Sequence, residues 1–340
     1  MRWYKQVGFL CILLTITACK SDRLDITVPE KEVAIELVRM EQDFVKITSV
    51  EDAQMKHRQY EGSFPELYAY YLGACLQAGR MEDSLVHENL YLFLRDTFMS
   101  GLNSELVNRF SDFPEYELIK NGFMYYSYYF PESTLPEKLV TYNSVFSNSV
   151  ISSPHEIGIG LERYLGADDP FIKKLPEQVF FQYIKKQMER KFMVRDAMMS
   201  WIGSNHFPEV DDNLVIAEQL VHWGKLLYLV EATLPRESKA VLLRYDEEEY
   251  KWAEENEIAF WKYLVEENFL FKREQKVARN IFSDGPFTPG LPIEEKAPPR
   301  LGQFLGWKIV KQYMDENKEV ELKEMISVDY KTILKTYKPE

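Results

Sequence analysis

Cysteine is scarce in this chain of 340 residues, and its scarcity excludes a fold held together by disulfides. Of the three cysteines, Cys11 and Cys19 lie in an N-terminal segment that we expect to be processed. Cys75 is then left alone in the mature chain, and one thiol cannot form an intramolecular disulfide. It lies in the apolar stretch YYLGACLQ, where a free cysteine usually behaves as a small buried hydrophobic residue. The fold therefore has to be held by packing.

Long apolar runs and an excess of positive charge are also missing. After the N-terminal segment, no apolar run approaches the roughly twenty residues that a membrane-spanning helix needs. The chain has 54 acidic and 41 basic residues, which give a net charge of −13 and a pI of about 5.1. This charge argues against nucleic acid as a partner and against adhesion to anionic lipid heads through a basic patch.

The sequence motifs of common enzyme classes are absent as well. The chain has no G-x-S-x-G, no phosphate-binding P-loop and no G-x-G-x-x-G between a strand and a helix. The zinc-peptidase motif H-E-x-x-H needs a second histidine four residues after the first. Ile159 stands at that place after His155-Glu156, and Tyr91 stands there after His87-Glu88.

The remaining histidines do not restore a metal site by their spacing. His206 and His222 could converge in space, but neither they nor His57 have ligand spacing in the sequence. The acidic run DEEEYKWAEENE (246–257) could hold calcium, although a solvated helix start explains it better. We therefore predict no catalytic residue, no metal ligand and no cofactor.

The N-terminus has the layout of a bacterial lipoprotein signal. The basic residues Arg2 and Lys5 precede an apolar run, and Ile16-Thr17-Ala18-Cys19 resembles a lipobox, in which the cysteine becomes the lipidated N-terminus. A plain signal peptide is the alternative. We predict a signal peptide over 1–18, a tether over 19–29 that carries lipid such as palmitate on Cys19, and one globular α+β domain over 30–340. The protein would then be anchored to the inner or outer membrane of the cell envelope, with the domain in the periplasm.

Hydrophobic periodicity indicates a mostly helical α+β fold with a small sheet. A capping-box pattern at Ser63 and Glu66 suggests a helix start. The aromatic cluster GFMYYSYYFPE (122–132) is best explained by a helix through the core, with a stacking platform for sugars or peptides as the alternative. Strands are predicted at 33–41, 137–148, 149–153 and 156–165, helices at 63–77, 82–98, 176–192, 192–203, 211–235, 246–271, 300–318 and 321–340, and a loop at 283–300.

The stretch IGIGLERYL (157–165) alternates with a period of two. Its isoleucines point to one side and Gly158 and Gly160 to the other, which suits a strand and suits a helix poorly. Glycines on one face allow a close approach, either of another backbone or of a ligand.

Three stretches carry a resemblance to a known family: IGIGLERYLGADDP (157–170), LVHWGKLLYLVEATLP (220–235) and RLGQFLGWKIVKQYM (300–314). In this order, and behind a lipobox, they resemble the gliding-motility lipoprotein family called GldB. The resemblance implies an envelope lipoprotein needed for gliding and for the associated secretion machinery. It also implies protein partners within a motility and secretion complex.

That family is similar to zincin-like metallopeptidases, so the resemblance also implies a zincin-like scaffold. The metal-binding helix would then be FMVRDAMMSW (192–201), which contains Arg195 and Asp196 but no histidine. The catalytic metal would have been lost, and the protein would not be an enzyme. The residues that could line a remaining groove or binding site are Gly158, Gly160, Glu162, Tyr164, His222 and Lys225.

Two alternatives remain open from the sequence. The first is a zinc-dependent peptidase with an atypical site. The second is a nutrient-binding lipoprotein that grips glycans or peptides with the aromatic residues around Tyr125–Tyr129.

Overall fold

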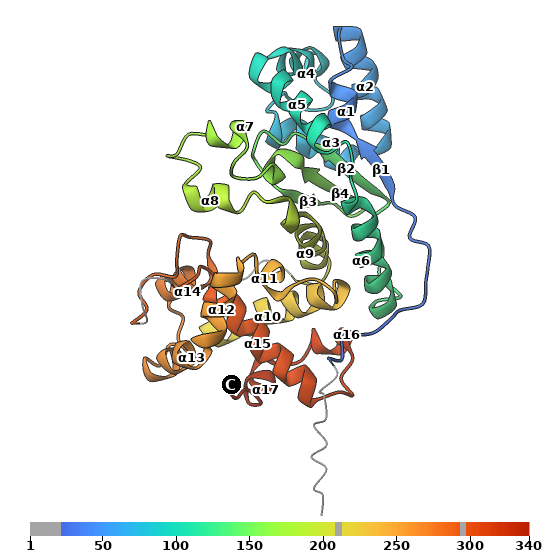
Figure 1. Ribbon diagram of the computed structural model, residues 1–340. Helices are drawn as coiled ribbons and strands as arrows, with labels where there is room; N and C mark the ends of the chain where they lie inside the picture. The colour runs from blue at the N-terminus through green and yellow to red at the C-terminus, as the bar shows by residue number, and fades with distance from the viewer. Residues whose placement is uncertain (1–21, 208–212, 293–296, 340) are drawn as a thin grey trace, which may run out of the picture.

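The computed structural model describes residues 22–207, 213–292 and 297–339 and is α+β, with more helix than strand, as predicted. A four-stranded sheet lies between helices α1–α5 on one side and α6 and α9 on the other, and the later helices form the opposite end of the molecule (Figure 1). Among the described residues, no helix is long and apolar enough to cross a membrane. The elements are β1 (Glu36–Arg39), α1 (Met40–Phe44), α2 (Val50–Ser63), α3 (Pro65–Tyr70), a π-helical turn (Tyr71–Cys75), α4 (Val86–Arg95), α5 (Thr97–Arg109), α6 (Glu115–Tyr129), β2 (Lys138–Tyr142), β3 (Val150–Ser152), β4 (Glu156–Gly160), a 3-10 helix (Leu161–Tyr164), α7 (Pro170–Lys173), α8 (Gln182–Lys186), a 3-10 helix (Arg190–Phe192), α9 (Met193–His206), α10 (Ile216–Thr233), α11 (Lys239–Leu243), α12 (Glu247–Glu255), α13 (Glu257–Glu266), α14 (Gln275–Phe282), α15 (Leu301–Glu316), α16 (Leu322–Met325) and α17 (Tyr330–Leu334).

The sheet has the strand order β1-β2-β4-β3. Strand β2 pairs in parallel with both β1 and β4, whereas the edge strand β3 is antiparallel to β4. β1 begins at Glu36, not at Val33 as predicted, because its partner β2 begins opposite it at Lys138. β2 ends at Tyr142, where the chain turns into the β2–β3 loop.

The predicted period of two is confirmed in β4. Ile157 and Ile159 belong to the larger hydrophobic core with α6, α9 and α10. Gly158 and Gly160 point to the other side of the sheet, Gly158 toward Tyr142 of the smaller core and Gly160 toward Ser144 and Asn148 of the β2–β3 loop. The strand ends at Gly160, and the residues after it form a 3-10 helix instead of continuing the strand.

The capping box predicted at Ser63 is wrong. Ser63 is the last residue of α2, and α3 begins at Pro65 without a side-chain cap. A capping box does open α2, where the Ser49 side chain accepts from Asp52 N at 3.1 Å and the Asp52 carboxylate accepts from Ser49 N at 3.1 Å.

Most helices predicted for the second half are confirmed. Those at 192–203, 211–235 and 300–318 correspond to α9, α10 and α15. The stretch 246–271 contains two helices, α12 and α13, which are separated at Asn256. Its acidic start is a capping box that opens α12, in agreement with the predicted helix start.

The long helix predicted at 176–192 is wrong for most of its length. Only α8 and a short 3-10 helix form there, because the chain folds back on itself. The buried Lys185 ammonium group donates to the carbonyl oxygen of Leu175 at 2.8 Å. Lys186 forms an ion pair with Asp246 at 2.7 Å, which fastens the same turn to the start of α12.

Helices α10 and α15 cross in backbone contact. A Cβ atom added at Gly224 would lie 2.0 Å from the carbonyl oxygen of Gly306, and one added at Gly306 would lie 2.0 Å from that of Leu220. No side chain fits at either position unless the helices separate. The two glycines therefore determine how closely α10 and α15 pack within the larger core.

We expect Gly224→Ala to destabilise the protein by about 3 kcal/mol, because the new methyl group overlaps the backbone of α15. Gly62→Ala in α2 is the control, since nothing lies within 4 Å of its added Cβ, and it should gain up to about 1 kcal/mol. Urea unfolding of both variants gives the comparison. Equal stability of the two would show that the helices can separate without cost.

Candidate functional site

The glycine face of β4 is covered by the protein itself. A Cβ at Gly158 would lie 2.7 Å from the Tyr142 ring and 2.8 Å from a methyl group of Leu67. A Cβ at Gly160 would lie 2.5 Å from the carbonyl oxygen of Asn148, in the β2–β3 loop. The close approach expected from these glycines is therefore made by the protein's own backbone and side chains.

Glu162 holds the β2–β3 loop from inside the protein. Its Oε1 atom accepts from the backbone N–H groups of Ser144 at 3.0 Å and Phe146 at 2.8 Å, and also from the Ser144 hydroxyl. Val145 and Phe146 both have left-handed backbones, with φ of 58° and 59°. Glu162 Oε2 is buried and has no hydrogen-bond partner among the described residues. Burial outweighs the hydrogen bonds and raises the pKa of Glu162.

Tyr164 belongs to a buried ionic network on α9. Its hydroxyl donates to Asp196 at 2.9 Å, and the same carboxylate forms ion pairs with Arg195 at 3.1 Å and Arg244 at 2.7 Å. Arg195 Nε also donates to the carbonyl oxygen of Leu242 at 2.8 Å. Arg195 and Asp196 therefore connect α9 to the region around α11. These are the two charged residues of the helix that the resemblance implied to be metal-binding.

His222 and Lys225 lie apart from this network, in a depression of about 280 Å³ between α10 and the turn before α17. The Lys225 ammonium group donates to the carbonyl oxygens of Ile326 at 2.8 Å and Val328 at 2.6 Å. Burial lowers the pKa of Lys225 to about 8. His206 also lines this depression.

The six predicted binding residues therefore form two separate groups. The first, around β4 and the 3-10 helix that follows it, is fully buried, and the second lines the depression on α10. In the described part of the chain, no three His, Cys, Asp or Glu side chains are grouped so that they could hold a metal ion.

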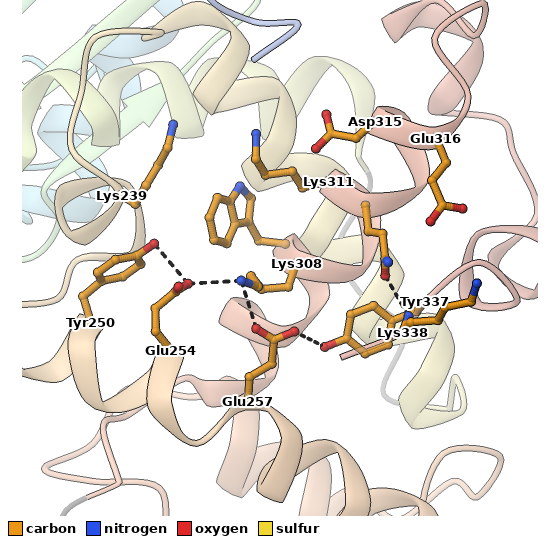
Figure 2. Close-up of a pocket in the computed structure, with 12 residues that line it drawn as sticks. Lys239, Tyr250, Glu254, Glu257, Lys308, Lys311, Asp315, Glu316, Tyr337 and Lys338 are labelled. Atoms are coloured by element: carbon orange, nitrogen blue, oxygen red, sulfur yellow. Dashed lines mark hydrogen bonds and ion pairs between the residues drawn. The ribbon is translucent and has the colours of Figure 1, made fainter. Parts of the chain in front are cut away.

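A larger pocket, which the sequence did not indicate, lies between α12, α13, α15 and the C-terminal tail (Figure 2). Its volume is about 390 Å³, and the rings of Tyr250, Trp307 and Tyr337 contribute to its walls. Three of its lining residues contact the buried Glu231 carboxylate, which accepts from Trp307 Nε1 at 2.5 Å and pairs with Lys239 at 2.5 Å and Lys311 at 3.5 Å. Glu231 is a lone acid inside the apolar run LLYLVEATL, and this is the feature of the sequence from which its buried ion pairs could have been predicted.

A second buried carboxylate, that of Glu257, lines the pocket itself (Figure 2). It accepts from the Tyr337 hydroxyl at 2.6 Å and lies 2.9 Å from the Lys308 ammonium group. Lys308 also pairs with Glu254 at 3.3 Å, and Glu254 accepts from the Tyr250 hydroxyl at 3.1 Å. These charged groups in and around the pocket are paired with one another beside the aromatic rings.

The other predicted features are easily placed. Cys75 is buried, which confirms the prediction, accepts from the Asn148 side chain at 3.2 Å and has a pKa raised by burial. The aromatic cluster is confirmed as a core helix, α6, in which Tyr125 and Tyr126 are buried and only Tyr128 is exposed. Cys19 lies outside the described residues.

We expect the stability of wild type relative to Glu162→Gln to depend on pH. Because the pKa of Glu162 is raised in the folded state, folding favours its protonated form, and this contribution is lost as the pH rises from about 4.5 through the raised value. Glutamine cannot lose a proton, so the variant should gain stability relative to wild type over that range. Urea unfolding between pH 4.5 and 8 measures the difference, and a constant difference would contradict the assignment.

We expect Glu231→Ala to cost about 3 kcal/mol, because it leaves the buried Trp307 N–H group and the half-buried Lys239 ammonium group without their acceptor. The matched control is Glu255→Ala, an exposed acid whose ion pair with Lys251 should contribute less than about 0.5 kcal/mol. Thermal or urea unfolding distinguishes the two variants. Similar small losses would mean that the lysines find other partners.

Comparison with known proteins gives one result. Searches among characterised proteins and among solved structures return no significant match. The model of one family, described as gliding motility protein GldB, matches residues 21–339, which is nearly the whole chain. The chain therefore belongs to the gliding motility protein GldB family.

Proposed function

We propose that this protein is a non-catalytic lipoprotein of the cell envelope that acts in gliding motility and the associated secretion machinery as an assembly or binding component. The observation that carries the proposal is the family match over residues 21–339. Membership of a gliding motility family implies a role in that process. The lipid anchor, the secretion machinery and the absence of catalysis are the further parts of the proposal.

The N-terminal sequence supports the anchor. A lipobox-like sequence ends at Cys19, two residues before the family match begins. The folded part starts immediately afterwards, because Leu24 and Val28 are buried. Much of the segment predicted as a tether, 19–29, is thus packed on the folded body.

The placement of α9 supports a binding rather than a catalytic role. A zincin-like scaffold stays a prediction, and in it this helix would carry the metal. Here Arg195 and Asp196 form a buried ion pair, and Arg244 pairs with the same aspartate. In the His155-Glu156 pair, the His155 side chain is exposed, and its Nδ1 atom lies 3.4 Å from the Glu137 carboxylate.

We expect deletion of the gene to abolish spreading on surfaces and the wild-type gene to restore it. Cys19→Ala should fail to restore spreading and should release the protein from the membrane fraction, because no cysteine remains to be acylated at the cleavage site. Cys11→Leu is the control, since it keeps the signal apolar and leaves Cys19 in place. Normal spreading of the deletion strain would overturn the motility role.

Metal analysis of the purified full-length protein tests the non-catalytic part of the proposal. We expect less than about a tenth of an equivalent of zinc and no proteolysis of denatured protein substrates. One equivalent of zinc together with protease activity would overturn it.

A further inference from the structure

The chain joins the folded body at the C-terminal end of α15. The Asp22 carboxylate forms an ion pair with Lys311 at 3.0 Å, and Leu24 is 3% exposed. Between them, Arg23 donates to three backbone carbonyl groups at the end of α15 and in the turn that follows it. These acceptors are Met314 at 2.8 Å, Asn317 at 3.3 Å and Val320 at 2.9 Å.

The covalent distance from this point to the expected lipid is short. Cys19 and Asp22 are three positions apart in the sequence, and three residue steps span at most about 11 Å when fully extended. This step rests on the proposed function, because it takes Cys19 as the lipidated residue. Acyl chains on Cys19 that enter a bilayer must therefore hold Asp22 close to the lipid head groups, and the folded body cannot stand away from the membrane.

We propose that the face formed by the C-terminal end of α15, the turn after it and α16 rests on the lipid head groups of the membrane that holds the anchor. This face is polar and carries both signs of charge. Among the described residues beyond Phe287, no large apolar side chain is exposed. The face contacts the head groups without entering the hydrocarbon, and the lipid on Cys19 supplies the attachment. Its exposed charged residues are Glu316, Lys318, Glu319, Glu321, Lys323 and Glu324.

The opposite end of the molecule then points away from the membrane. Figure 1 places α2 and α4 at that end, with the sheet between them and α16. Leu85, just before α4, and Leu92, within it, are 56% and 65% exposed.

Fluorescent probes on single cysteines test this orientation. Full-length lipidated protein with Cys75→Ala and either Lys318→Cys or Leu92→Cys is reconstituted into vesicles of phosphatidylethanolamine and phosphatidylglycerol that contain lipids with nitroxide head groups. Both positions are exposed in the structure. We expect several-fold stronger quenching of the probe at 318 than of the probe at 92. Equal quenching, or stronger quenching at 92, in vesicle-bound protein would overturn the proposed orientation.

Flotation of the vesicles separates this proposal from the anchor itself. Protein that does not float lacks the anchor, and both proposals fail; protein that floats with equal quenching refutes the orientation alone. A Gly-Ser insertion of about twelve residues before Asp22 extends the reach to roughly 20 Å. It should leave flotation unchanged and reduce the quenching at 318 toward the value at 92. Undiminished quenching would overturn the claim that the short connection determines the orientation.

Discussion

The backbone contact between α10 and α15 is the constraint on which most of the second half of the protein depends. Only glycine at positions 224 and 306 lets the helices approach so closely. That approach places Trp307 and Lys311 of one helix against Glu231 of the other, and the same Trp307 and Lys311 line the pocket shown in Figure 2. A wider separation would leave the Glu231 carboxylate buried without its donors, which is why packing and charge pairing are inseparable there.

Elements defined by local periodicity could be predicted from the sequence. The alternation of isoleucine with glycine predicted β4, and the 3.6-residue period predicted α9, α10 and α15. The helix prediction that was wrong, at 176–192, failed because of contacts in the tertiary structure. The segment 176–192 folds back because Lys185 bonds to a nearby carbonyl group and Lys186 pairs with Asp246, 60 residues away in the sequence. Periodicity carries no information about such distant partners.

The candidate sites were much less predictable than the fold. Glu162 and Lys225 were selected because they lie in stretches that resemble the family, but their roles come from partners far along the chain. Glu162 bonds to Ser144 across 18 residues, and Lys225 to Val328 across 103. From the sequence, a charged residue looks the same whether its hydrogen-bond partners are water molecules or distant backbone groups. The lone acid Glu231 in an apolar run was a usable local sign, because a buried charge needs a partner.

The segment from Asp22 to β1 also has a mechanical consequence. Arg23 grips the end of α15, and the chain then passes α6, where Ile26 accepts from Tyr125 at 3.2 Å, before it enters the sheet at Glu36 (Figure 1). Tension applied through the N-terminus acts first on the Arg23 hydrogen bonds and the Asp22 ion pair. Those contacts must break before the load reaches the central strands, so the sheet is shielded from forces that arise at the point of attachment.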